Sequence, residues 1–187
     1  MAGLQVNFNV IQANNSLSVR FTELTGAYNL LTNPTGYGFP NATLAQVSTA
    51  TIFITRPDGV QFTLQNISPL PSSTNQFIDI ANVDLGLNSG TKLQDGFYVF
   101  TYEVQGTTPT QSGILSRLSK NVLLYNDVEC CVRKMGSSSC GCTHNEFVEA
   151  FNLFNAMLSA NLCGNYSGAQ EILERLQVMC SNKCKCH

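Results

Sequence analysis

The chain has 187 residues, of which 43% are apolar and only 12% are charged, and its formal net charge is −2. Residues 1–116 carry three basic side chains against six acidic ones, which excludes a cationic surface for a phosphate backbone, so no direct nucleic-acid binding is expected. No apolar run reaches membrane-spanning length and no signal peptide is visible at the N-terminus, so we expect synthesis in a cytosol and no membrane association.

Alternating apolar and polar residues run through the first 126 residues and predict strands with one buried face. The alternating rows are Leu4 to Val10, Leu17 to Phe21, Ile52 to Ile54, Val60 to Leu64, Phe77 to Ile80, Phe97 to Val104 and Ile114 to Tyr125. Between the third and fourth rows, Pro57 and Gly59 predict a hairpin turn, because proline presets φ and glycine permits positive φ. About seven short strands separated by turns are typical of a β-sandwich.

Tyr98 lies just inside one of these strands, as does the tyrosine corner of immunoglobulin-like folds. An ordinary aromatic strand is the alternative. We predict a mainly β chain in which an Ig-like β-sandwich occupies residues 1–126.

One connection, Thr25 to Thr43, is long, aromatic and rich in glycine and proline. Its aromatic residues Tyr28, Tyr37 and Phe39 argue against a disordered loop. Aromatic residues are enriched at protein interfaces, so these three are candidate interaction residues. Local packing on the domain is the alternative.

After Asn126 the apolar period changes to three and four, which predicts helices. Asn126, with Glu129 three residues later, predicts a capped short helix that ends at Gly136 and buries one face. The apolar face of that helix is Val128, Cys131, Val132 and Met135.

Two longer helices should follow, each beginning at a capping box and joined by the turn from Gly164 to Gly168. The boxes are Thr143 with Glu146 and Ser167 with Gln170. The predicted apolar stripes are Phe147, Ala150, Phe151, Phe154 and Leu158 on the first helix, and Ala169, Ile172, Leu173, Leu176, Met179 and Cys180 on the second. We therefore predict that residues 127–187 form a C-terminal Cys-rich α-helical hairpin.

All eight cysteines and both histidines lie between Cys130 and His187. The pairs Cys140/Cys142 and Cys184/Cys186 flank the hairpin, so an antiparallel arrangement could bring four thiolates to one structural zinc ion. Disulfides are the second interpretation, although a reducing cytosol disfavours them. Free thiols are the third, with Cys131 and Cys180 serving as small apolar residues on their helix faces. The sequence leaves all three open.

Catalytic signatures are missing from the sequence: there is no Gly-x-Ser-x-Gly, no phosphate-binding glycine loop and no His-Glu-x-x-His. No histidine lies in the predicted sandwich to act as a general base. The single acidic residues at strand ends are expected to be solvated. We therefore expect a protein that is not an enzyme, with no catalytic residues.

Several turn and cap segments resemble virion proteins of crAss-like tailed bacteriophages of gut Bacteroidales. They are Thr25-Gly-Ala-Tyr28, Asn33-Pro-Thr-Gly-Tyr-Gly-Phe-Pro-Asn41, Thr55-Arg-Pro-Asp-Gly59, Asp95-Gly-Phe-Tyr98 and Gly164-Asn-Tyr-Ser-Gly-Ala-Gln170. The resemblance implies a structural neck or tail protein, a ring or connector subunit located in the virion and made in the host cytoplasm. Its expected partners are portal, neck or tail subunits and further copies of itself in a homo-oligomeric ring. The alternative is a glycan- or receptor-binding module on a phage fibre or capsid surface, with Tyr28, Tyr37 and Phe39 stacking on sugars.

Overall fold

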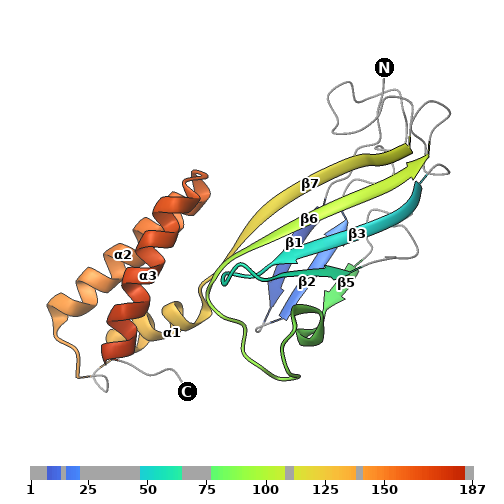
Figure 1. Cartoon of the computed structure of the whole chain (residues 1–187). Coiled ribbons are helices and arrows are strands. Elements are labelled where there is room, and N and C mark those ends of the chain that lie inside the picture. The colour runs from blue at the N-terminus through green and yellow to red at the C-terminus, as the bar shows by residue number, and fades with distance from the viewer. Residues whose placement is uncertain are drawn as a thin grey trace. The chain divides into compact units, whose positions relative to one another are not determined.

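The computed structural model describes residues 8–13, 16–21, 47–64, 77–107, 112–137 and 141–183. These residues form seven strands followed by three helices, with a short 3₁₀ helix between the fifth and sixth strands (Figure 1). The strands are β1 Phe8–Ala13, β2 Ser16–Phe21, β3 Val47–Thr55, β4 Gln61–Leu64, β5 Phe77–Ile80, β6 Gly96–Thr107 and β7 Ser112–Leu124. The helices are α1 Asn126–Met135, α2 His144–Leu162 and α3 Tyr166–Lys183, and the 3₁₀ helix is Asn82–Leu85.

The strands form two sheets, one of three strands in the order β1-β2-β5 and one of four in the order β4-β3-β6-β7. In the first sheet β2 pairs antiparallel with both neighbours, so that Val19 lies opposite Val10 and Ile78. In the second sheet β3 pairs antiparallel with β4 and β6, so that Ile52 lies opposite Leu64 and Tyr102. The predicted succession of short strands is confirmed.

Alternate residues of the strands are buried, as the period-two pattern predicts. Ile52 and Ile54 of β3 and Phe100 and Tyr102 of β6 are each 0% exposed. In the other sheet, Leu17 and Val19 of β2 are 1% and 0% exposed. Each sheet therefore buries one apolar face, and this burial supplies most of the stabilisation of the sheet region.

The predicted hairpin turn joins β3 to β4. The Arg56 N–H donates to the carbonyl of Val60 at 3.0 Å, and the Gly59 N–H donates to the carbonyl of Arg56 at 2.9 Å. Gly59 has a φ of +82°, which a residue with a Cβ rarely adopts. A hydrogen bond from the Arg56 guanidinium lowers the pKa of the Asp58 carboxyl.

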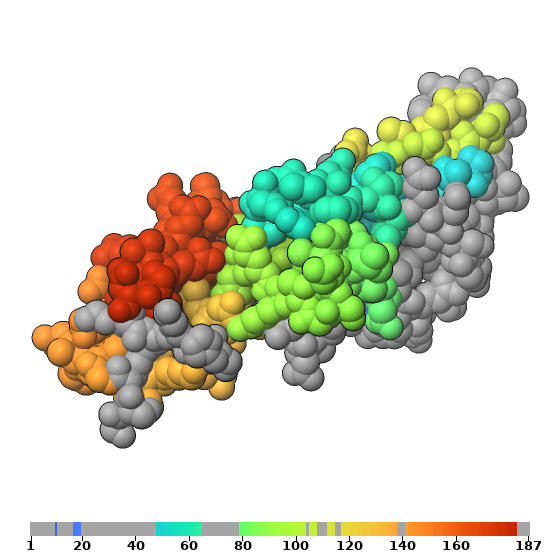
Figure 2. Space-filling view, turned by 60° about the horizontal axis from the view of Figure 1, so that its bottom comes forward, coloured from blue at the N-terminus to red at the C-terminus, as the bar shows by residue number. Residues whose placement is uncertain are grey.

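The Arg56 guanidinium also anchors the 3₁₀ segment to this hairpin. Its Nη1 donates to the carbonyl of Leu85 at 2.9 Å, and its Cζ lies 5.4 Å from the centre of the Phe62 ring. Gly86 lies against the same ring, and an added Cβ there would come within 2.5 Å of Phe62. Its φ of +66° also favours glycine. Figure 2 shows the turquoise hairpin surface beside the green surface of the following segment.

The described residues fall into two compact units. The sheet unit takes the chain up to Leu93 and from Tyr98 to Val122, and the helical unit takes Gln94 to Phe97 and the chain from Leu123. The helical unit therefore includes a short stretch that precedes β6 as well as the three helices. That stretch lies inside the range predicted to be sandwich.

Helices α2 and α3 lie side by side as the predicted hairpin (Figure 1). The capping box at the start of α2 is confirmed: the Glu146 N–H donates to Thr143 Oγ1 at 3.3 Å, and the Thr143 N–H donates to Glu146 Oε2 at 2.8 Å. Of the predicted α2 stripe, Ala150 is 0% exposed, whereas Phe151 is 48% exposed. Met157, which the prediction omitted, is 0% exposed.

The predicted N-terminal caps of α1 and α3 are wrong. Helix α1 is capped at Tyr125 without a side-chain hydrogen bond from that residue. Helix α3 begins at Tyr166, and the Gly168 N–H donates to Asn165 Oδ1 at 3.1 Å. Asn165 is thus the capping residue of α3, and Ser167 lies inside the helix. A shift of two residues suffices because both side chains are good caps and only the turn geometry decides between them.

Replacing Asn165 by alanine is expected to lower the free energy of unfolding of the helical unit by about 1 kcal/mol, the usual cost of a lost helix cap. Ser167→Ala is the matched control and should cost less than half as much. Chemical denaturation of the full chain, followed through the helical circular dichroism signal, measures both. A larger loss of stability in Ser167→Ala would show that Ser167, as predicted from the sequence, is the capping residue.

Within the described ranges, no helix is long and apolar enough to cross a membrane.

Candidate interaction surface on the helical unit

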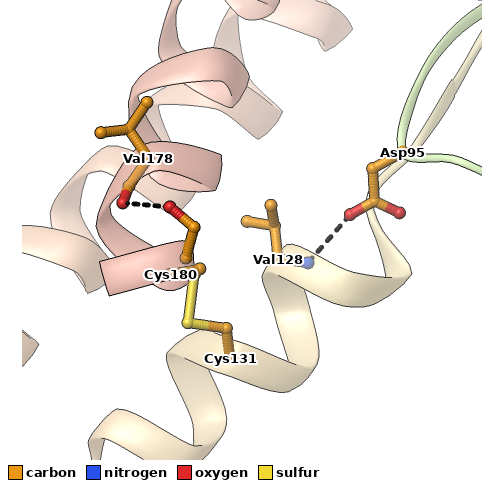
Figure 3. Close-up of a disulfide and its surroundings, with 6 residues drawn as sticks. Asp95, Val128, Cys131, Val178 and Cys180 are labelled. Atoms are coloured by element: carbon orange, nitrogen blue, oxygen red, sulfur yellow. Dashed lines mark hydrogen bonds between the residues drawn. A yellow bond between two sulfur atoms is a disulfide. The ribbon is translucent and has the colours of Figure 1, made fainter. Parts of the chain in front are cut away.

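The N-terminus of α1 is capped by the side chain of Asp95, which is 32 residues away from the nearer of its two partners. Asp95 Oδ2 accepts a hydrogen bond from the Val128 N–H at 2.9 Å (Figure 3), and its Oδ1 accepts one from the Asp127 N–H at 3.2 Å. A carboxylate here satisfies unpaired backbone donors and meets the positive end of the helix dipole. Asp95 is only 5% exposed, so the expectation that such acidic residues are solvated is wrong for it.

A disulfide joins α1 to α3. Cys131 and Cys180 are bonded, with their Cα atoms 5.9 Å apart and a separation of 49 positions in sequence (Figure 3). The interpretation of these two cysteines as apolar free thiols is therefore wrong, although both contribute to the apolar core of the unit. Each lay on a predicted buried face, and burial on facing helices is what brought them together. Among the described cysteines, Cys130 and Cys163 carry free thiols.

The core of the helical unit is drawn from all three helices. The stripes predicted for α1 and α3 are confirmed, and Leu173 and Leu176 of α3 are both 0% exposed. The buried members of this core are Leu123, Val128, Cys131, Val132, Met135, Ala150, Met157, Ala169, Leu173 and Leu176. The disulfide and the Asp95 cap therefore hold α1 onto a small core that α2 and α3 already share.

With α1 held there, an apolar groove of about 510 Å³ opens between α1 and α2. Phe147, Phe151 and Phe154 line the α2 side, and Val132 and Gly136 line the α1 side together with Glu129, Arg133 and Ser137. An added Cβ on Gly136 would approach the Phe147 ring to 2.9 Å. Glycine at this position therefore lets the aromatic ring lie close to the end of α1.

Two aromatic contacts set the rings of the groove. The Phe147 and Phe151 rings are 5.9 Å apart between centroids, and Phe154 meets Tyr125 edge to face at 5.6 Å. The Phe154 ring is thus held by its contact with Tyr125, whereas Phe151 remains 48% exposed. The groove presents aromatic surface to solvent.

Large apolar side chains are exposed along α2 and α3 beyond this groove. Leu162 is 85% exposed, Val178 is 61% exposed, and Val148 and Tyr166 are 39% and 41% exposed. Scattered exposed apolar residues are ordinary, but Val148, Phe151 and Leu162 share one face of α2 by their spacing, and an exposed apolar face is typical of an interaction surface.

Charged side chains near this surface are paired within the unit. Arg133 pairs with Glu129 along α1, and Arg175 of α3 pairs with Glu149 of α2 at 2.8 Å. Both pairs are largely exposed, so each contributes little to stability. Of the two, only Glu129 with Arg133 lines the groove, and there the two charges balance each other.

Most residues predicted to carry a site lie outside the described residues. These are Tyr28, Tyr37, Phe39, Cys140, Cys184 and Cys186. Cys142 is described, is partly buried and packs against the helical core. The zinc site and the aromatic contact loop therefore stay predictions. Within the described part of the chain, no group of three or more His, Cys, Asp or Glu side chains is placed to hold a metal ion.

Comparison with known proteins found no matching family model, no matching curated protein and no matching solved structure.

Proposed function

We propose that the chain is a non-enzymatic structural subunit of a tailed-phage virion, a neck or tail ring or connector component that packs against portal, neck or tail subunits and against its own copies. It is made in the host cytoplasm and located in the virion. The observation that carries this proposal is the exposed apolar surface of α2 and α3, on which Leu162 is 85% exposed. Together with a charged share of only 12%, this surface suits a protein that is covered by other subunits.

The strand order supports the Ig-like part of the proposal. In constant-type immunoglobulin domains the first, second and fifth strands share one sheet, and the third, sixth and seventh share the other. The orders β1-β2-β5 and β3-β6-β7 follow this division, while β4 pairs with β3 instead of β5. Tyr98 lies near the start of the sixth strand and is 1% exposed, which suits the tyrosine corner. We propose that the two sheets form an Ig-like sandwich.

The disulfide is consistent with a protein that functions outside the cell. Thiols stay reduced in most cytosols, and disulfides persist in oxidising surroundings. A virion subunit is made reduced and can oxidise after release. The bond between Cys131 and Cys180 is then a feature of the mature particle.

The proposal is tested on purified particles of the phage that encodes the chain. Quantitative mass spectrometry of salt-washed particles should find the chain at a constant copy number relative to the portal protein. Cells infected by the same phage and sampled before lysis should contain it mainly in assembling particles. A chain that stays in the soluble fraction and is missing from washed particles would overturn the proposal.

A further inference from the structure

Helix α2 carries two adjacent apolar seams, and within the described residues one lies in the core of the helical unit while the other is largely exposed. Phe147, Ala150, Phe154, Met157 and Asn161 recur at alternating intervals of three and four, and this inner seam faces the core, where Ala150 and Met157 are 0% exposed. A second set is shifted by one residue and has the same spacing: Val148, Phe151, Asn155, Leu158 and Leu162, here called the outer seam. Such spacing is the heptad pattern with which a helix packs against another helix.

The outer seam is open along most of its length. Val148, Phe151 and Leu162 are 39%, 48% and 85% exposed. Asn155 is also exposed, whereas Leu158 is partly buried against the core of the unit. The groove between α1 and α2 runs beside Phe151, so a side chain from another helix would find an apolar recess there.

Asn155 occupies the central position of the seam, an a position of the heptad. A single asparagine at an a position sets the register and the number of helices in a coiled coil, because its side chain hydrogen-bonds best to the same residue of a neighbouring helix. That preference favours a partner with an asparagine at the matching point of its own seam. A second copy of this chain provides one.

The charge pattern permits identical copies to meet. The positions that flank the outer seam are Phe147, Phe154 and Asn161 on one side and Asn152 and Ser159 on the other, and none is charged. Like charges at flanking positions would repel between identical helices. The two acidic residues of α2 are held elsewhere: Glu146 in the capping box with Thr143, and Glu149 by Arg175.

We propose that the outer seam of α2 packs against the outer seam of a second copy of the chain, parallel and in register, so that Asn155 meets Asn155. This inference rests on the proposed assembly function and names the surface and the occupant. A half-turn about an axis parallel to the helices brings identical residues together, so this contact is isologous and closes as a pair. A ring would join such pairs through another surface of the chain.

The contact is expected to be weak in isolation. From Val148 to Leu162 the seam is about 21 Å long, and a helix is about 10 Å wide. That area falls short of the roughly 1,200 Å² that stable interfaces bury in total. Association should therefore be concentration-dependent, in the micromolar range or weaker, and stronger where a particle already holds the subunits close together.

Cross-linking of the full chain tests the register. The Val148→Cys variant is prepared with light and with heavy nitrogen, and the two preparations are mixed and treated with a short bismaleimide. We expect a mixed-isotope cross-link that joins position 148 of one copy to position 148 of the other. Ala156→Cys is the control, because this exposed residue of α2 lies outside the seam and should give no such link. Links from position 148 only to other positions, or no link at any concentration, would overturn the parallel pairing.

Sedimentation of three further variants tests the seam itself. Leu162→Lys should weaken association roughly tenfold or more, because like charges then face each other, whereas Ala156→Lys should leave it unchanged. Asn155→Leu should strengthen association roughly tenfold and broaden the range of oligomers, because an asparagine at an a position specifies the oligomeric state at a cost in stability. Equal behaviour of the two lysine variants would overturn the proposal.

Failure of the seam and failure of the virion proposal are distinguishable. A chain present at constant copy number in washed particles, but with no link at position 148, keeps the virion function and assigns its contacts to another surface. A seam that pairs in solution while the chain is missing from particles keeps the pairing and removes the virion role.

Discussion

Replacing Cys131 and Cys180 together by alanine is expected to lower the free energy of unfolding of the helical unit by about 4 kcal/mol, because the bond closes a loop of about 50 residues in the unfolded chain. The two cysteines join α1 to α3 across 49 residues of sequence. Their loss frees α1, which has only ten residues and is too short to stay helical alone. A unit this small depends strongly on such a cross-link.

Chemical denaturation of the full chain, followed through the helical circular dichroism signal, measures this loss. Cys163→Ala is the control, because the exposed free thiol of Cys163 takes no part in the bond and its replacement should change stability little. Adding a reductant should destabilise the wild-type helical unit much more than the doubly substituted one. Equal sensitivity of both proteins to the reductant would assign the redox effect to other cysteines.

Asp95→Ala is expected to cost about 2–3 kcal/mol, the range for losing hydrogen bonds to a charged, buried cap. Two backbone N–H groups at the start of α1, those of Asp127 and Val128, lose their acceptor. Tyr125, the N-cap residue, accepts no hydrogen bond through its side chain and so does not replace the lost acceptor. The start of α1 should therefore fray, and the groove that α1 forms with α2 should open.

Hydrogen exchange measured by mass spectrometry locates this effect. The amides of α1 should exchange faster in Asp95→Ala, whereas those of α2 should change little. Asp95→Asn retains one acceptor oxygen and should lose roughly half as much stability, since hydrogen bonds to neutral acceptors contribute less. Asp84→Ala is the surface control, because Asp84 accepts from the Ala81 N–H at an exposed site. Unchanged exchange in α1 would show that the cap contributes nothing to holding the helix.

These two anchors bear on the proposed function. The disulfide holds α1 to α3, the Asp95 cap holds the start of α1, and α1 forms one side of the groove beside Phe151. Variants that release α1 should therefore also weaken any assembly that uses the outer seam. Association and stability should fall together in Asp95→Ala, whereas in Leu162→Lys association should fall while stability is kept.

Local periodicity in the sequence predicts most elements of the fold, because it reports which faces are buried. Alternation placed the strands, as with Phe77–Ile80, and a period of three and four placed α1 at Asn126–Met135. The turn at Gly59 and the cap at Thr143 also followed from local chemistry. In each case the residues that interact are close in sequence, so the signal can be read directly.

Contacts between residues far apart in the chain depend on how the elements pack and cannot be predicted from local patterns. Nothing local marks Asp95 as the cap of a helix that begins more than 30 residues later, or selects Cys180 as the partner of Cys131 among the eight cysteines. The same holds for Phe151, which its spacing placed on the predicted apolar stripe of α2 but whose 48% exposure depends on where α1 and α3 lie. Side chains on a helix are fixed by sequence, but which of them remain open for a partner is fixed by the neighbours that cover the rest.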